Sequence, residues 1–169
     1  MRSFLLALIL ILTAPAYASD ALIDTNLKQA EPVGSAHYKY LFLDIYDATL
    51  YAPNSEWSFS APFALELKYL RSLSGKKIAD RSAKEIRQQG FNNEVRLADW
   101  HTQMTSIFPD VRQGTTLTGI YKPNSETVFY KGQEIIGRIQ DPDFGKWFFG
   151  IWLSENTSDP EFRKALLGK

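Results

Sequence analysis

The stretch from His37 to Pro53, HYKYLFLDIYDATLYAP, constrains the fold more than any other part of the chain. It is rich in aromatic and β-branched residues, it contains no glycine, and its only proline is the last residue, which is the composition of a β-strand. Under the two-residue period of a strand, both of its faces are largely apolar. We therefore expect one long strand that is covered on both sides, rather than an edge strand.

The two faces of this predicted strand differ in their chemistry. The first face carries tyrosine hydroxyls and a carboxylate, from Tyr38, Tyr40, Asp44 and Tyr46. The second carries aliphatic side chains that suit a core, namely Leu41, Leu43 and Ile45. Large rings with polar tips suit either a hydrogen-bonded structural network or the wall of a ligand pocket. Asp44 needs partners or an open cavity in either case, because burying an unpaired carboxylate is unfavourable.

The first 18 residues have the pattern of a secretory signal peptide. One arginine precedes an apolar run from Phe4 to Leu12, and Ala16-Tyr17-Ala18 is a small-x-small cleavage site. The run is too short for an ordinary transmembrane helix, although a retained membrane anchor is the alternative interpretation. We expect cleavage after Ala18, a single domain over residues 19–169, and a periplasmic or secreted protein without stable membrane insertion.

Charge and cysteine content exclude several classes of function. The 19 basic and 19 acidic residues cancel, and no basic stripe points to nucleic acid or to an anionic membrane surface. The absence of cysteine excludes disulfides, iron–sulfur clusters, thiolate zinc sites and a cysteine nucleophile. Neither His37 nor His101 has the neighbours of a metal site. We expect no metal and no cofactor, and the sequence leaves protein partners open.

Hydrophobic periodicity divides the rest of the chain into the elements of an α+β domain. Residues 19–32 are predicted to form a polar lead-in that contains one short strand. After the long strand, another strand is expected from Phe63 to Arg71. Helices are expected from Lys76 to Gln89, with Ser74 as cap, and from Glu94 to Phe108. Short strands over 115–121, 127–130 and 134–139 and helices beginning near 141 and 158 complete the prediction, an antiparallel sheet packed by helices.

The order of several short motifs resembles the chalcone isomerase-like family, and most closely its bacterial, exported branch. The motifs are Val33-Gly34-Ser35 before a strand that ends in Leu50-Tyr51, Leu67-x-Tyr69-Leu70-Arg71 running into Gly75-Lys76-Lys77-Ile78-Ala79, Phe129-Tyr130-Lys131-Gly132, and Phe144…Ile151-Trp152-Leu153 followed by Leu166-Leu167-Gly168. The resemblance extends from about Leu27 to Gly168. It implies an open-faced β-sandwich, in which a large antiparallel sheet and a layer of helices enclose a cleft.

The resemblance also implies which positions form a site. Chalcone isomerases add a phenoxide to an enone, and an arginine early in the long strand stabilises the enolate; inactive members hold fatty acids, whose carboxylate meets that arginine. The arginine position falls on Tyr38 here, the helix tyrosine of the plant enzymes near Ile78, and their strand threonine near Tyr46. A phenol offers one donor and no charge, and losing an oxyanion donor typically costs about 3–4 kcal/mol. Strand phase allows Arg71 to supply a compensating charge.

We therefore predict an exported, non-catalytic protein that binds a hydrophobic or amphipathic small molecule, such as a fatty acid, in the cleft between sheet and helices. The ligand-binding candidates are Tyr38, Tyr40, Asp44, Tyr46, Arg71 and Ile78, and no catalytic residue is assigned. The alternative is an isomerase or intramolecular lyase acting on a chalcone-like phenolic or enone compound, with Tyr38 or Tyr46 as acid or base. A third possibility is a structural partner in an envelope complex, with the cleft filled by side chains.

Overall fold

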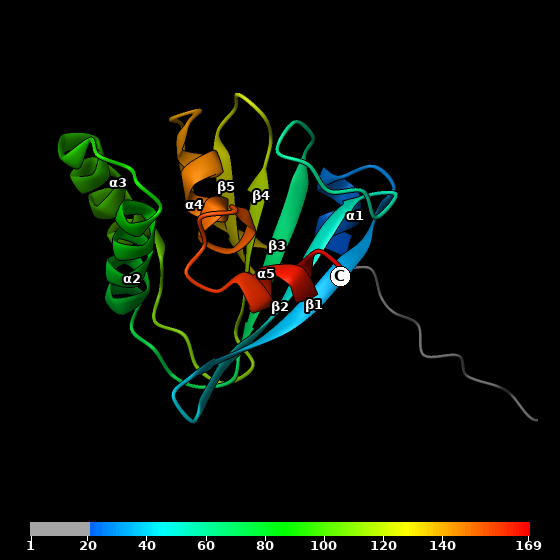
Figure 1. Ribbon diagram of the computed structural model, residues 1–169, viewed down its shortest axis with the longest axis horizontal. Helices are drawn as coiled ribbons and strands as arrows, with labels where there is room; N and C mark the ends of the chain where they lie inside the picture. Colours follow the sequence, from blue (N-terminus) through cyan, green and yellow to red (C-terminus); the bar gives the residue numbers. More distant parts are fainter. Residues whose placement is uncertain (1–20) are drawn as a thin grey trace, which may run out of the picture.

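Six strands, arranged in chain order, form one antiparallel sheet (Figure 1). The computed structural model describes residues 21–169, so the predicted signal peptide lies outside the described residues. Every strand pairs with its neighbours in the sequence, which confirms the predicted antiparallel sheet of an α+β fold. The strands are β1 (Ala30–Tyr40), β2 (Leu43–Pro53), β3 (Phe63–Tyr69), β4 (Thr116–Tyr121), β5 (Thr127–Lys131) and β6 (Glu134–Ile139).

The prediction of one uninterrupted strand from His37 to Pro53 is wrong, because the stretch is a hairpin. A two-residue turn, Leu41-Phe42, joins β1 to β2 and leaves Tyr40 paired with Leu43. Leu41 has φ of 57°, a backbone conformation that glycine or asparagine usually supplies at such turns. Leu41 and Leu43 were expected in the core and are instead 76% and 37% exposed.

A β-bulge in β2 determines where the side chains near this turn point. Tyr38 pairs with Tyr46, but the next residue, Lys39, pairs with Asp44, so that Ile45 is an extra residue without a partner. An extra residue shifts the alternation of side chains by one position. Ile45 is therefore buried, whereas Asp44 turns to the outer face of the sheet, opposite to the face that simple alternation from Tyr46 predicts.

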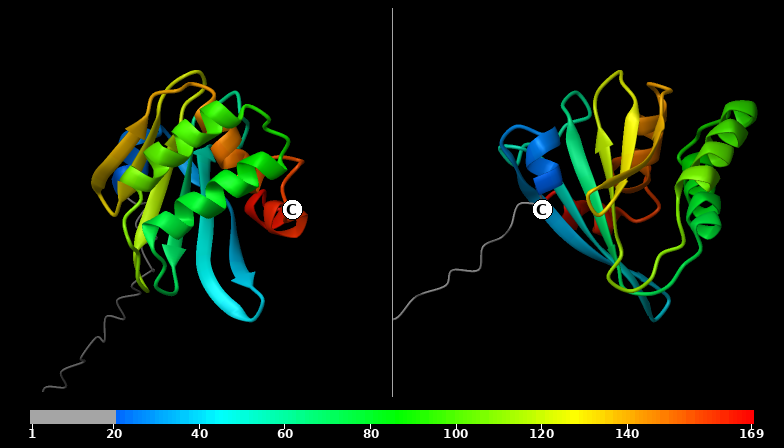
Figure 2. Two further views of the ribbon diagram at one scale, coloured as in Figure 1. Left: turned by 90° about the vertical axis from the view of Figure 1, so that its left-hand side faces the viewer. Right: turned by 180° about the vertical axis from the view of Figure 1, so that it is seen from behind.

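The helices cover the two faces of the sheet unequally (Figures 1 and 2). Four of them pack on the inner face, while the shortest, which the sequence did not predict, covers part of the outer face. The N-cap of the second helix is the predicted one, since the Ser74 hydroxyl accepts from the backbone N–H of Lys77. The helices are α1 (Ala21–Asn26), α2 (Gly75–Gln88), α3 (Glu94–Ile107), α4 (Phe144–Leu153) and α5 (Pro160–Leu166).

The core between the inner face and the helices is strongly aromatic. Helix α4 contributes Phe144, Phe148 and Phe149, all at most 6% exposed, and Phe149 lies against Gly119 of β4. A Cβ at Gly119 would come within 2.8 Å of the Phe149 ring, so the absence of a side chain there makes room for the helix. This core fixes α4 over the middle of the sheet and leaves the end near the β1–β2 turn less filled.

The C-terminal helix α5 is held directly against β1 at Gly34. A Cβ at this position would lie 2.4 Å from the carbonyl oxygen of Ala165 and 2.7 Å from that of Leu166. Both atoms belong to the backbone, so they cannot move aside as a flexible side chain can. Gly34 therefore allows the close approach that brings Phe162 of α5 onto the inner face of β1 and β2.

The variant Gly34→Ala should lower the free energy of unfolding by about 1–3 kcal/mol, because overpacking against backbone forces α5 away from the sheet. Chemical denaturation followed by circular dichroism measures this change. The neighbouring variant Ser35→Ala, at an exposed position, is the control and should stay within about 0.5 kcal/mol of the parent chain. Equal stability of Gly34→Ala and the parent would contradict the contact.

Candidate functional site

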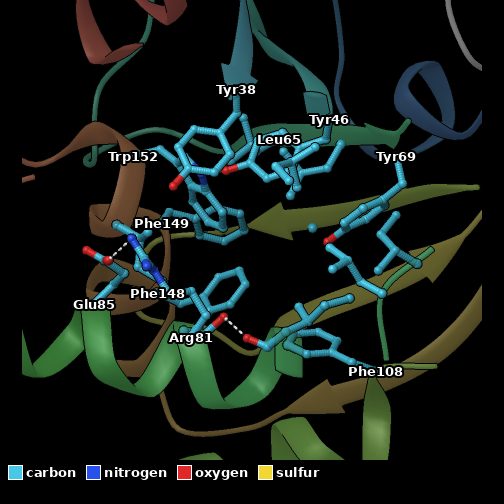
Figure 3. A pocket seen from close by; sticks show the side chains of 18 of the residues that line it. Tyr38, Tyr46, Leu65, Tyr69, Arg81, Glu85, Phe108, Phe148, Phe149 and Trp152 are labelled. Atoms are coloured by element: carbon cyan, nitrogen blue, oxygen red, sulfur yellow. Dashed lines mark hydrogen bonds and ion pairs between the residues drawn. The ribbon is translucent and has the colours of Figure 1, made fainter. Parts of the chain in front are cut away.

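An apolar cavity of about 260 Å³ lies between the inner face of the sheet and helices α2, α4 and α5 (Figure 3). This volume lies just below the usual range of small-molecule sites. An engineered apolar cavity of roughly 150 Å³ holds benzene, so this one has room for a larger apolar group. Side chains from the sheet, from α4 and from the end of α3 supply most of the lining, including Leu65, Leu67, Phe108, Leu117, Phe129, Phe148, Phe149 and Ile151.

A row of three tyrosines crosses the sheet at one end of the cavity. The register places Tyr38 of β1 opposite Tyr46 of β2, and Tyr46 opposite Tyr69 of β3, so the three rings share the inner face. The first two rings stack with centroids 4.9 Å apart, and the second and third meet edge to face at 5.8 Å. The indole N–H of Trp152 donates to the Tyr46 hydroxyl at 3.0 Å, which fixes α4 against this row.

The three hydroxyls differ in their partners but share one protonation state. Burial raises the pKa of Tyr46 and of Tyr69 far above the ordinary value, and it also raises the pKa of Tyr38. The phenols are therefore neutral at physiological pH and act as hydrogen-bond donors or acceptors rather than as bases. Within residues 21–169, neither the Tyr38 nor the Tyr69 hydroxyl has a hydrogen-bond partner, so both are open to a ligand.

Three of the four charged residues that line the cavity lie on α2, and the fourth, Asp159, is the N-cap of α5. Glu85 is buried, and its Oε1 lies 2.6 Å from Nη2 of Arg81, one helical turn earlier, as an ion pair without the alignment of a hydrogen bond. Its Oε2 accepts from the Ser158 hydroxyl at 2.7 Å. Lys77 lines the same side and has no ion-pair partner in the described part of the chain. The Arg81 guanidinium also lies over the Tyr40 ring, 6.0 Å from its centroid.

Four of the six residues that the sequence singled out line this cavity: Tyr38, Tyr40, Tyr46 and Ile78. Asp44 lies outside it, since the bulge at Ile45 turns its carboxylate to the outer face. There Oδ1 of Asp44 lies 2.7 Å from Nε2 of His37, whose Nδ1 is 2.6 Å from Asp47.

Arg71 is also absent from the lining, because β3 ends at Tyr69 and the strand phase that placed Arg71 inward does not continue. Sequence reasoning missed the cation that is present, Arg81. A signal was available: Arg81 stands three residues after Ile78, and residues at this spacing share a helix face.

The described residues contain no group of three or more histidine, aspartate or glutamate side chains that could hold a metal ion. Over residues 21–169, no helix is both long enough and apolar enough to cross a bilayer.

Comparison with known protein families shows which family this chain belongs to. The family model described as chalcone isomerase-like matches residues 33–168, which is most of the chain. The chain belongs to the chalcone isomerase-like family. A comparison with curated proteins found no matching sequence. Among solved structures, a fatty-acid binding protein from Arabidopsis thaliana is similar in fold, with a TM-score of 0.63 and 11% identity over 83% of this chain and 87% of that one.

The hydrogen bond between Trp152 and Tyr46 provides a test of the tyrosine row. Tyr46→Phe should lower the free energy of unfolding by about 0.5–1.5 kcal/mol, because it removes the acceptor of a part-buried indole N–H. Tyr69→Phe is the matched control and should be neutral or slightly stabilising, since its hydroxyl has no partner to lose. Thermal denaturation of both variants checks the contrast, and an equal loss in Tyr69→Phe would contradict it.

The exposed cluster around His37 provides a pH-dependent test. Hydrogen bonds to Asp44 and Asp47 raise the pKa of His37 above its ordinary value of 6.5. The protonated form is thus favoured in the fold, so its contribution to stability is complete below pH 6.5 and disappears as the pH rises through the raised value. NMR titration of the His37 ring should show this raised pKa, and Asp47→Asn should bring it back towards 6.5. An unchanged midpoint in Asp47→Asn would contradict the geometry.

Proposed function

We propose that this chain is a non-catalytic binding protein for an amphipathic molecule with an acyl chain and an acidic head group, such as a fatty acid. The observation that carries the proposal is the apolar cavity with a cationic side chain at one side. The cavity would take the chain, because most of its lining residues are aromatic or aliphatic. The name of the similar Arabidopsis thaliana structure, a fatty-acid binding protein, is consistent with this ligand class.

Arg81 and Lys77 are the groups that we propose for the acidic head. Arg81 is 47% exposed and uses one nitrogen for Glu85, so that its other donors are free to meet a carboxylate. Lys77 lies one turn earlier on the same helix and adds a second positive charge. The neutral hydroxyl of Tyr38, at the position of the family's arginine, would then donate a hydrogen bond rather than supply the charge.

Catalysis of the chalcone isomerase type has less support from the same residues. Its developing enolate needs a preorganised cationic donor at the sheet, where Tyr38 offers an uncharged one. A tyrosine base would need a lowered pKa, whereas burial raises the pKa of all three tyrosines in the row. The carboxylate of Glu85 is paired with Arg81 and accepts a hydrogen bond from Ser158, an arrangement that favours a structural role over that of a general base.

We also propose, from the sequence of residues 1–18, that the chain is exported and works in a bacterial periplasm or outside the cell. Mass spectrometry of the N-terminus after expression with an export pathway tests this, and the expected mature chain begins at Ser19. A protein that keeps residues 1–18 and stays in the cytoplasm would overturn it.

The head-group assignment is tested with decanoate and decan-1-ol, which share a chain and differ in charge. The variant Arg81→Gln/Glu85→Gln removes both charges, so no lone carboxylate is left buried. It should weaken decanoate binding by about 10- to 100-fold, since hydrogen bonds to charged groups are worth about 1.5–3 kcal/mol. Decan-1-ol binding should change by less than about threefold, because the apolar lining is intact. Isothermal titration calorimetry measures both affinities.

Arg112→Gln is the matched control, because Arg112 is exposed and does not line the cavity. It should leave both affinities as they are. Equal loss of decanoate and decan-1-ol binding in the double variant would show a structural effect and contradict the assignment. Failure of the parent chain to bind either compound, together with native mass spectra free of any bound molecule after mild extraction, would overturn the proposed function itself.

A further inference from the structure

The tip of the β1–β2 hairpin exposes four large apolar side chains in succession. Tyr40, Leu41, Phe42 and Leu43 are 51%, 76%, 85% and 37% exposed. The tip projects past the rest of the sheet, because β3 pairs with β2 only as far as Tyr46 (Figure 1). Single exposed apolar residues are ordinary, but a contiguous exposed group marks an interaction site.

The chemistry of the turn argues that these side chains have a use. Leu41 occupies the first turn position with a positive φ, where glycine relieves the strain and polar residues are usual. Phe42 at the second position is the most exposed large apolar side chain in the described part of the chain, together with Val95. Both side chains are unfavourable for solubility, and Leu41 is also unfavourable for the backbone conformation of the turn. Strained positions such as Leu41 gather at functional sites.

The shape of the tip favours a fluid apolar phase over a protein surface. At a two-residue turn the side chains project around the end of a narrow ribbon instead of forming one flat face. A bilayer surrounds such a tip on all sides, whereas a rigid partner covers only part of it. Tyr40 adds a ring with a hydroxyl, which suits the boundary between lipid tails and head groups. The guanidinium of Arg81 lies over the Tyr40 ring, and Lys77 is one turn earlier on α2, which brings positive charge to the side of the tip where lipid phosphates would be met.

The same tip borders the cavity. Tyr40 lines the cavity and belongs to the tip, so the exposed apolar surface is continuous with the apolar lining inside. We propose that the β1–β2 hairpin tip inserts into the surface of a lipid bilayer and brings the mouth of the cavity to the membrane. An acyl chain then passes between bilayer and cavity without crossing water; this transfer step rests on the proposed function, whereas the insertion of the tip does not.

Site-specific labelling tests the insertion. The chain has no cysteine, so Phe42→Cys labelled with nitrobenzoxadiazole reports on the tip alone. With vesicles of phosphatidylcholine and phosphatidylglycerol in equal amounts, the fluorescence of this label should rise and shift to the blue. The control label at Lys122→Cys lies in the β4–β5 turn, beside the opposite end of β3, and should not respond. Vesicles of phosphatidylcholine alone should give a weaker response, since their surface has no net negative charge to attract Lys77 and Arg81.

A second variant separates insertion from folding. Leu41→Gly/Phe42→Asn replaces the tip with residues that the turn prefers, so the variant should be at least as stable to heat as the parent chain. Its affinity for the vesicles should fall by at least about tenfold, because burying a leucine or a phenylalanine contributes more than that factor. Both chains are used in the mature form that begins at Ser19, so residues 1–18 cannot contribute to co-sedimentation with the vesicles.

Equal vesicle binding by the variant and the parent, or a silent label at position 42, would overturn the insertion. With a benzophenone label at position 42 in place of nitrobenzoxadiazole, crosslinking to a single protein of a cell-envelope extract, together with no response to vesicles, would overturn it in favour of a protein partner. Decanoate binding in the absence of vesicles, measured on Leu41→Gly/Phe42→Asn, distinguishes the two proposals. If the parent chain inserts into vesicles but does not bind decanoate, the insertion stands and the proposed function is contradicted.

Discussion

The register of β1, β2 and β3 around the extra residue Ile45 determines what the cavity is made of. On one side of the bulge, Tyr38, Tyr46 and Tyr69 come into line across three strands and face the helices. On the other side, Asp44 turns away, which leaves the sheet wall of the cavity uncharged. In a register shifted by one residue, β2 would turn Tyr46 to the outer face and Asp47 to the inner one. The chemistry of the site therefore depends on a local irregularity of the backbone.

Because the sheet contributes no charge, all charge at the cavity comes from the helix side. Arg81 and Glu85 lie one turn apart on α2, and the buried carboxylate depends on both Arg81 and Ser158. Only the carboxylate of the pair is buried, and the attraction of Arg81 together with the hydrogen bond from Ser158 offsets part of its desolvation penalty. A cation on a helix surface, partly exposed, is placed to meet a head group that remains near water.

Much of the fold could be predicted from local patterns. The alternation of Phe63 to Tyr69 and the 3.6-residue period of α2, with Ser74 as cap, locate their elements to within two residues. The turn at Leu41-Phe42 could not be found, because neither residue is one that turns prefer and the apolar pattern continues through it. No pattern in the sequence indicates the bulge at Ile45 either, so Asp44 was assigned to the wrong face of the sheet. Helix α1 is too short for its period to stand out, and its burial depends on contacts with the outer face of the sheet.

The contact of α5 with Gly34 has a consequence for how the chain acquires its cavity. Residues 165–168 meet β1 at the far end of the described sequence, so closing this contact brings together segments that are separated by nearly the whole chain. Contacts of such high sequence separation lose the most entropy on closure and form slowly. Phe162, which α5 carries onto Tyr38 and Tyr46, is part of the cavity lining. During synthesis, therefore, the binding space stays open on one side until α5 has left the ribosome.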